Sequence, residues 1–577
     1  MAMTAAARGS GWARSARSAV VVALGLTLAG CTGTTPLPEP TTASATPTPS
    51  TAIPAQEPEA IFTFGAAADP TGLDPALVVD TESYRITRQI LEGLVSVDPL
   101  TSEPVPLLAS SWEERDEGRA YAFTLREDVE FHDGEPFNAE AVCANFDRWY
   151  SLPPAARTVE GIIAFGSVFN AYSDAPELSI YSSCQPLGEF EVLIQLSSRL
   201  TGFIPTLAMP SFAMSSPRAL EEFAADNLSE ERNDTELSQY ALNPVGTGPF
   251  TFESWAPGEV RLSSFDDYWG ERGEIGTVVF VTLPLPDERL EALNTGQIDG
   301  YDFVTVDNAG ELVREGQQLL QRDPYSILYL GMNQDFPGVD SLLFRQAIAH
   351  AIDKQAVIDG LFLNGTAPAD QFVPPKLAVT NEEITTYDYD VELARSLLEE
   401  SGYDGEPLPF HYPTDVSRPY LPAPEGVFAV LQTQLEEAGF TIEPVPTAWA
   451  DGYLEALQND DDRAFHLLGW SGTYQDPDNF VGQLFGATTT EFAFNDNQLF
   501  SKMNRARTLP NGEDRTAAYQ DISDQLARRL PAVPLAFPIS ALAVSERVAA
   551  YPVSPLMNEV FNLIDLTDVD LEPASDD

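Results

Sequence analysis

Four histidines and a large excess of carboxylates are the residues of this chain that could do acid–base or metal chemistry. The histidines are His132, His350, His411 and His466, and the sequence contains no CxxC or HxxxH spacing. A zinc site draws on nitrogen and sulfur ligands at such close spacings. We therefore expect no metal and no other cofactor. His132 opens a His-Asp-Gly turn, in which Gly134 suits a positive φ.

A secreted hydrolase is the enzyme class that could be built from these residues. It would need a nucleophile beside a base, yet the sequence contains no GxSxG motif. Carboxylate pairs such as Asp266-Asp267 could imitate a glycosidase, but a chain with 88 acidic residues contains such pairs by chance. The segment from Gly246 to Pro249 lacks the GxGxxG spacing of a nucleotide site. We expect a protein that is not an enzyme, and keep the hydrolase as an alternative.

The charge balance excludes one class of partner. The chain has 31 Lys and Arg against 88 Asp and Glu, a formal net charge of −57. Nucleic acid binding requires clustered basic residues that neutralise phosphates, so no nucleic acid partner is expected. The acids are spread along nearly every segment, which favours solubility and points to no particular site. Asp476-Pro477-Asp478 lacks the Asp-x-Asp-x-Asp-Gly spacing of a calcium loop and is interpreted as a capping turn.

The stretch GWSGTYQDPDNF combines aromatic and small polar residues in the way that a ligand pocket needs. Trp470 and Tyr474 offer flat apolar faces with a polar edge, while Ser471, Gly472 and Thr473 offer hydroxyls and backbone groups. A few convergent polar groups on an apolar wall are typical of small-molecule sites. We therefore predict that these five residues bind a ligand. The alternative is that Trp470 is a core residue.

The N-terminal region has the order of a secretory signal peptide. Three arginines precede an apolar run from Ala19 to Leu28, which is too short to span a bilayer comfortably. The small residues before Cys31 resemble a bacterial lipobox, in which the cysteine is lipidated and becomes the new N-terminus; an ordinary signal peptide with a chance cysteine is the alternative. Residues 32–58 are rich in Pro and Thr and are predicted to be an extended tether. The protein is thus expected to be secreted and anchored by lipid to the outer face of the cell membrane.

Alternating strands and helices follow from Ile61 and predict an α/β fold. Expected strands are 61–67, 121–125, 190–196, 327–332, 441–446 and 464–470, and expected helices are 83–94, 138–150, 340–358, 391–402 and 425–440. Asn138 and Asp340 suit helix N-caps, and Gly402 and Gly439 suit left-handed helix ends.

The predicted secretion also affects how the two cysteines other than Cys31 are interpreted. Cys143 lies on the helix predicted at 138–150, within plausible reach of the loop at Cys184. An even number of cysteines in an oxidising compartment favours one disulfide, Cys143–Cys184, and two buried free thiols are the alternative.

Six phrases, in order, resemble the solute-binding lipoproteins of peptide/nickel-type (family 5) ABC importers. They occupy residues 107–142, 244–270, 289–302, 344–362, 387–403 and 469–480, within a resemblance that covers about 61–565. The resemblance implies a two-lobed periplasmic-binding-protein fold (class II, cluster C type) with a subdomain inserted in lobe I. It divides the chain into a signal peptide (1–30), a lipidated Cys with its tether (31–58), lobe I (61–105, 241–325 and 536–577, the last with an acidic tail), the inserted subdomain (106–240) and lobe II (326–535).

The same resemblance implies that the protein is a monomer that captures a peptide or peptide-like solute between its lobes and delivers it to an ABC permease. Trp449, Thr81 and Ser83 match further ligand-contacting positions of the family. Thr473 stands where peptide-binding members carry an Asp that pairs with the peptide amine, so a solute with a free N-terminus is in question. A surface receptor or sensor on the same fold is the alternative function.

Overall fold

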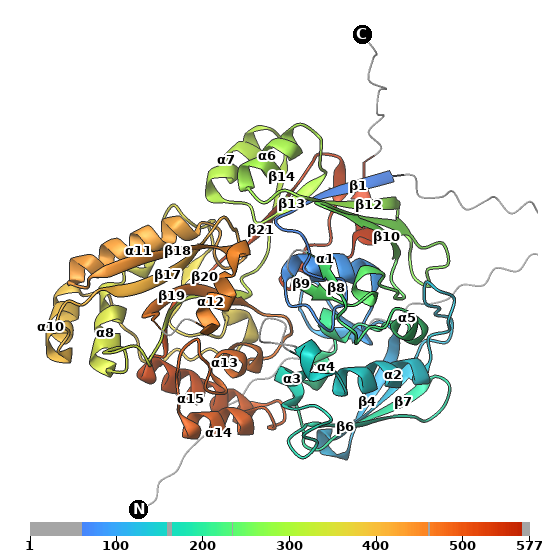
Figure 1. Ribbon diagram of the computed structural model, residues 1–577, viewed down its shortest axis with the longest axis horizontal. Coiled ribbons are helices and arrows are strands. Elements are labelled where there is room, and N and C mark those ends of the chain that lie inside the picture. The colour runs from blue at the N-terminus through green and yellow to red at the C-terminus, as the bar shows by residue number, and fades with distance from the viewer. Residues whose placement is uncertain (1–59, 158–163, 233–234, 460–461, 568–577) are drawn as a thin grey trace, which may run out of the picture. The chain divides into compact units, whose positions relative to one another are not determined.

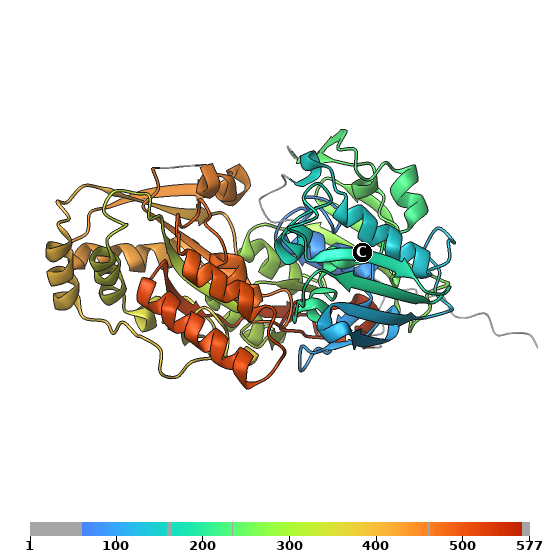
Figure 2. The ribbon, with the colours of Figure 1, turned by 90° about the horizontal axis from the view of Figure 1, so that it is seen from below.

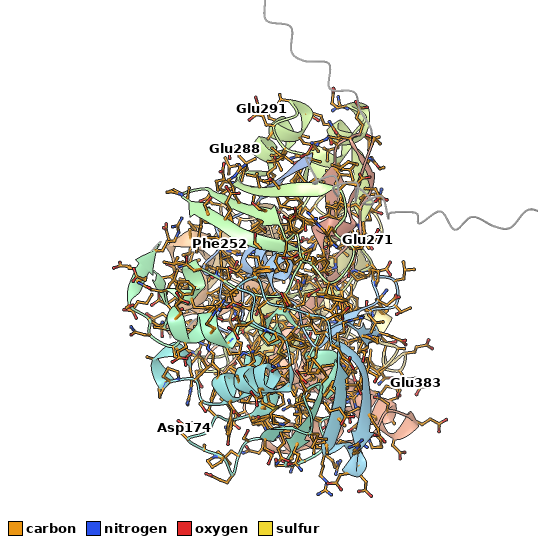
Figure 3. The ribbon with its side chains drawn as sticks, turned by 90° about the vertical axis from the view of Figure 1, so that its right-hand side faces the viewer. Asp174, Phe252, Glu271, Glu288, Glu291 and Glu383 are labelled. Atoms are coloured by element: carbon orange, nitrogen blue, oxygen red, sulfur yellow. A yellow bond between two sulfur atoms is a disulfide. The ribbon has the colours of Figure 1, made fainter. Side chains whose placement is uncertain are left out.

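The computed structural model describes residues 60–157, 164–232, 235–459 and 462–567. The predicted signal peptide, Cys31, the tether and the end of the acidic tail lie outside these ranges. Within them, no helix is both long and apolar enough to cross a bilayer. Exposed acids such as Asp174, Glu271 and Glu383 stand at the periphery (Figure 3), in line with acids spread along the chain.

A seven-stranded mixed sheet is assembled from three separate stretches of the chain (Figure 1). Its strands, in spatial order, are β10 (Phe250–Ala256), β11 (Glu259–Ser264), β12 (Ile275–Thr282), β1 (Ala60–Ala66), β13 (Gly300–Asp302), β21 (Ala541–Val544) and β14 (Gln318–Gln321). Parallel pairing of β1 with β12 and β13 places β1 inside the sheet. Phe62 and Phe64 of β1 accordingly lie fully buried in the core beside helix α1 (Thr81–Ile90).

A separate four-stranded antiparallel sheet lies in the segment predicted to be the inserted subdomain. Its order is β4 (Ala109–Arg115), β5 (Ala120–Leu125), β7 (Glu191–Leu196) and β6 (Tyr181–Pro186). Helix α2 (Ala139–Tyr150) packs on it, and the Asn138 side chain accepts a hydrogen bond from the amide of Ala141, as expected for an N-cap. Cys143 on α2 and Cys184 on β6 form a disulfide, with their Cα atoms 5.2 Å apart.

A six-stranded sheet is built from the second half of the chain. Its order is β16 (Ala367–Pro368), β20 (Ala532–Phe537), β15 (Ser326–Met332), β19 (Phe465–Ser471), β17 (Leu408–Thr414) and β18 (Ile442–Ala448). Strand β20 extends two residues past 535, the predicted end of lobe II. Every residue of β15 is buried, because neighbouring strands flank it and helices cover both faces of the sheet.

The helices around this sheet separate into two groups, each packed on its own core (Figure 1, Figure 2). One face carries α8 (Leu342–Ala351), α10 (Val391–Ser401) and α11 (Pro424–Ala438); the other carries α12 (Tyr453–Asn459), α13 (Asp478–Phe485), α14 (Asn497–Ala506) and α15 (Glu513–Arg529). Helices α10 and α11 end at Gly402 and Gly439 with φ of 83° and 106°, which confirms the predicted left-handed ends.

The remaining elements are short. They are β2 (Val95–Val97), β3 (Pro104–Pro106), α3 (Ala164–Phe169), α4 (Phe203–Thr206), α5 (Pro217–Glu222), β8 (Glu230–Arg232), β9 (Thr235–Leu237), α6 (Pro286–Asn294), α7 (Val306–Arg314), α9 (Lys354–Ile358), β22 (Val548–Ala550) and β23 (Asp565–Leu566).

Two predicted helices differ from the structure. The helix expected at 83–94 ends at Ile90, because the carbonyl of Ile90 accepts a hydrogen bond from the amide of Gly248 on a distant segment. The helix expected at 340–358 is broken, because the Asp353 side chain accepts a hydrogen bond from the amide of Ala356 and starts α9. Asp340 is not its cap, since α8 begins after Ser341.

Two short connections join the seven-stranded and six-stranded sheets. The chain leaves the first sheet after Gln321 and enters the second at Ser326, and it returns between Phe537 and Ala541. The amide of Arg322 on the first connection donates to the carbonyl of Ser540 on the second, at 2.9 Å. We call these two bonded segments the crossings (322–325 and 538–540).

Candidate functional site

The candidate site starts at the carboxyl end of β19, as predicted. Trp470 is half-buried near the end of this strand, and its indole N–H has no hydrogen-bond partner among the described residues. Beside it, the Ser471 hydroxyl lies 2.8 Å from the hydroxyl of Ser326 on β15. The indole N–H is itself buried, so what this half-buried side chain offers is a flat face that can stack on a flat group.

Gly472 is required at its position by packing. A Cβ atom there would lie 2.4 Å from the ring of Tyr325 and 2.7 Å from that of Phe480. The Gly472 amide donates to the carbonyl of Tyr325 at 2.9 Å. The backbone turn that follows Trp470 is therefore held tightly against the neighbouring strand.

Thr473 is held by a buried side-chain amide. Asn479 accepts from the Thr473 amide at 2.8 Å and donates to the Thr473 hydroxyl at 3.3 Å. No carboxylate stands at this position, so Thr473 supplies no negative charge to a ligand.

Tyr474 is buried and does not line a solvent-accessible surface in the structure. Only 2% of its surface is exposed, and its ring packs in the core of the four-stranded sheet together with residues such as Phe203 and Leu207. Burial raises the pKa of its hydroxyl well above the ordinary value. Its contact with a ligand stays a prediction.

The Asp-Pro-Asp turn is held by two buried arginines. Asp476 accepts from Arg515 at 2.7 Å through each carboxylate oxygen, and Asp478 pairs with Arg507 at 2.8 Å. Burial raises the pKa of Asp478 to about 6, although Arg507 opposes this shift. Asp476 also accepts from the amide of Asp478 at the start of α13, in keeping with the predicted capping turn.

The side chain of Arg418 lies on the ring of Trp449, the aromatic residue that the family resemblance adds to the site. The guanidinium of Arg418 lies 3.9 Å from the centroid of the Trp449 ring, and its Nε has no hydrogen-bond partner among the described residues. Trp449 and Trp470 pack against the same hydrophobic core. Arg418 is not among the residues predicted from the sequence. Its sequence signal is the Arg-Pro-Tyr stretch before α11, which forms a turn closed by paired backbone hydrogen bonds between Arg418 and Leu421.

The two residues predicted on lobe I lie at the start of α1. Thr81 is its first residue and is half-exposed. Ser83 is fully buried, and its hydroxyl accepts from the amides of Thr71 and Gly72 at 2.9 and 3.3 Å. In this structure the Ser83 hydroxyl therefore holds a neighbouring loop.

Contacts within the protein occupy His132 and His466. His132 accepts from the amide of Gly246 at 3.4 Å, its Nε2 lies 2.9 Å from the carbonyl of Gly248, and burial lowers its pKa to about 4. The ring of His466 fills the space above Gly331. Among the described residues, no group of three His, Cys, Asp or Glu side chains could hold a metal ion. A cavity of about 10 Å³ beside Lys354 and Thr385 is lined by none of the predicted site residues.

Comparisons with known proteins agree with this architecture. The family model for "bacterial extracellular solute-binding proteins, family 5 Middle" matches residues 103–492. Heme-binding protein A of Haemophilus influenzae is 28% identical over 519 residues, which covers 87% of this chain and 91% of that protein. The dipeptide-binding protein of Escherichia coli strain K12 is 26% identical, with coverages of 86% and 93%.

A solved structure gives the fold. The periplasmic binding protein DppA of Helicobacter pylori, in complex with the peptide STSA, superposes with a TM-score of 0.77 at 24% identity, and covers 88% of this chain and 98% of that one. The fold is thus the two-lobed α/β fold of periplasmic binding proteins. Since the family model spans more than half of its residues, the chain belongs to the bacterial extracellular solute-binding proteins of family 5.

Proposed function

We propose that this protein captures a peptide or peptide-like solute between its two lobes and delivers it to the permease of an ABC importer. The observation that carries this proposal is a pair of half-buried tryptophans on one core: Trp470 near the end of β19, and Trp449 directly after β18 with Arg418 on its face. Two aromatic faces and one cation on a common core provide stacking and a positive charge for a small solute.

The charges of this group favour a solute that bears a carboxylate. Arg418 offers planar donors that match a carboxylate, although its Nε is buried without a partner among the described residues. Thr473 is neutral and held by Asn479, so this position cannot pair with an ammonium group. We therefore expect that the solute needs its carboxylate more than a free amine.

The remaining parts of the proposal concern the whole chain. Residues 1–30 act as a signal peptide, Cys31 carries a lipid anchor, and 31–58 form the tether. The four-stranded sheet is the centre of the subdomain inserted in lobe I, and the six-stranded sheet is the centre of lobe II. The protein works as a monomer without catalysis, and Trp470, Ser471, Gly472, Thr473, Tyr474, Trp449, Thr81 and Ser83 form the ligand-binding region.

The solute class is tested by thermal unfolding of the purified protein with a panel of compounds. The panel contains matched dipeptides that are free, N-acetylated or C-amidated, together with an opine, a sugar, heme and a metal chelate. Ligand at 100 times its Kd stabilises the native state by about 2.7 kcal/mol, which raises Tm. We expect shifts with the free and N-acetylated forms and little shift with the C-amidated form. A site that prefers a free amine would reverse this order.

The role of Arg418 is tested by Arg418→Gln. We expect this variant to lose most of the shift, since a charge-assisted bidentate hydrogen bond is removed. Arg505→Gln, at an exposed position on α14, is the matched control. Equal shifts in the two variants would remove Arg418 from the site.

A further inference from the structure

The first turn of α1 is tied to the sheet of lobe I by a buried carboxylate. Glu82 is almost fully buried and accepts from the amide of Ala67, directly after β1, at 3.4 Å. It also accepts from Nε of Arg85, one turn later, at 3.1 Å. Thr81 and Ser83, the residues predicted to face the solute, flank Glu82 in this turn.

The same arginine continues the chain of ion pairs away from the helix. Arg85 donates to one oxygen of Asp302 at 2.7 Å, and Arg322 donates to the other oxygen at 2.7 Å. Burial alone would raise the pKa of Asp302, but the two guanidinium groups outweigh it and lower the pKa to about 2. Asp302 is therefore negatively charged at any pH near neutrality.

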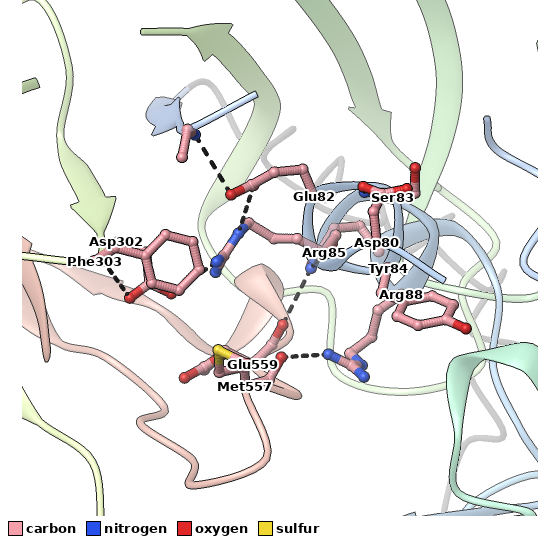
Figure 4. Close-up of polar contacts among 12 residues, drawn as sticks. Asp80, Glu82, Ser83, Tyr84, Arg85, Arg88, Asp302, Phe303, Met557 and Glu559 are labelled. Carbon is pink, nitrogen blue, oxygen red and sulfur yellow. Dashed lines mark hydrogen bonds and ion pairs between the residues drawn. The ribbon is translucent and has the colours of Figure 1, made fainter. Parts of the chain in front are cut away.

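Arg322 connects this network to both crossings. It lies on the first crossing, is only 1% exposed, and donates through Nε to Glu559 at 2.8 Å. Its amide donates to Ser540 on the second crossing. The C-terminal segment around Glu559 also contacts α1, because Gln89 donates to the carbonyl of Glu559 at 3.1 Å. Figure 4 shows Arg85 between Glu82 and Asp302, with Glu559 beside the helix.

Within this cluster acids and arginines lie close together, and the fully buried Arg289 also interacts electrostatically with Glu82 and Asp302. Glu82, Asp302 and Glu559 face Arg85, Arg322 and Arg88, and Arg88 donates to the carbonyl of Met557 (Figure 4). Buried ion pairs seldom stabilise a fold more than apolar residues of the same size would, but they specify geometry, since each partner fixes the next. A continuous series of such pairs is suited to holding α1 and the crossings in one arrangement.

We propose that Arg322 is a positioning residue, and that the series Glu82–Arg85–Asp302–Arg322 couples the first turn of α1 to both crossings. A displacement of the turn moves Arg85, which shares Asp302 with Arg322, and Arg322 holds the two crossings together. If the turn contacts the solute, a point that rests on the proposed function, this series links solute contact to the closing of the lobes.

The test is hydrogen–deuterium exchange on the solute-free protein, read at the two ends of the series. Glu82→Gln changes one end, and the readout is the Arg322 amide. Arg322→Lys changes the other end, and the readout is the Ala67 amide. Glu271→Gln and Arg314→Lys, both at exposed positions of lobe I, are the matched controls.

We expect each variant to accelerate exchange at the far end by about tenfold or more, because coupled segments open together. Acceleration confined to the substituted end, or equal to that in the controls, would overturn the coupling. If Arg322→Lys fails to fold, Glu82→Gln alone tests the coupling, because its effect is measured as the exchange rate of the Arg322 amide.

A second arm uses a solute that the thermal panel identifies. Arg322→Lys is expected to weaken its Kd by about tenfold, within the usual range of coupling between sites, while Arg314→Lys leaves it unchanged. An unchanged Kd in Arg322→Lys would overturn the link to closing. A panel without any hit would contradict the proposed function and leave the exchange result standing, so the two failures are distinguishable.

Discussion

Glu92 offers a prediction whose size follows from the structure. Its carboxylate is buried directly after α1 and accepts three side-chain hydrogen bonds: from Tyr268 at 2.9 Å, and from Thr247 and Trp269 at 2.8 Å. Burial nevertheless outweighs these donors and raises the pKa of Glu92 from 4.5 to about 7.

The sign of the pH dependence follows from this shift. Between pH 4.5 and 7 the native protein keeps a proton on Glu92 that the unfolded chain has lost. The stabilisation from Glu92 is therefore fully present below pH 4.5 and is lost as the pH rises to 7. A pKa of about 7 in place of 4.5 corresponds to a loss of about 3 kcal/mol in the free energy of unfolding.

Glu92→Gln isolates this effect. The amide oxygen can accept from Trp269 and Thr247, and the amide nitrogen can donate to the Tyr268 hydroxyl, so the packing is retained while the titration is removed. Between pH 4.5 and 7.5 the free energy of unfolding of the variant, minus that of the wild type, should rise by about 3 kcal/mol.

The assay is urea unfolding at pH 4.5, 6.0 and 7.5 for the wild type, for Glu92→Gln and for the exposed control Glu271→Gln. The control should follow the wild type at every pH. Parallel pH dependence of Glu92→Gln and the wild type would show that Glu92 has an ordinary pKa, and would refute the reasoning.

Three further predictions concern stability. Replacing both Cys143 and Cys184 by Ser should lower the free energy of unfolding by about 4 kcal/mol, because the bond closes a loop with a sequence separation of 41; urea midpoints under oxidising and reducing conditions measure this. Gly331→Ala should lower Tm, because the new methyl group would lie 1.9 Å from the ring of His466, and overpacking costs about 1–3 kcal/mol. Gly310→Ala, on the exposed face of α7 with nothing within 4 Å, should raise stability by about 1 kcal/mol; a lower Tm would contradict the packing described here.

Much of the fold could be predicted because local signals and the structure agree. Gly402 and Gly439 end their helices with positive φ, and Asn138 caps α2. Gly246 and Gly248 allow a close approach of two backbones, as a Cβ at either position would collide with the carbonyl at the end of α1. These residues act within a few positions of themselves or through size alone, so a single sequence suffices to interpret them.

The misplaced helix ends have causes that a local pattern does not contain. The apolar stripe from Ile86 to Leu94 continues past the true end of α1, because the bond from Gly248 to the carbonyl of Ile90 comes from a segment more than 150 residues away. The stripe at 340–358 is also continuous, but Asp353 provides a side-chain cap that competes with the helix.

The stretch GWSGTYQDPDNF illustrates why the site was harder to predict than the fold. Aromatic and acidic residues serve a pocket and a core equally well, and their partners decide between the two. Tyr474 packs with the core of the four-stranded sheet, and Asp476 is neutralised by Arg515, 39 positions later. Trp470 is only half-buried, and Arg418 lies over Trp449 although 31 positions separate the two in sequence. The end of the stretch is therefore fixed by buried contacts, while its beginning remains the predicted part of the site, and this division follows from contacts that no short motif encodes.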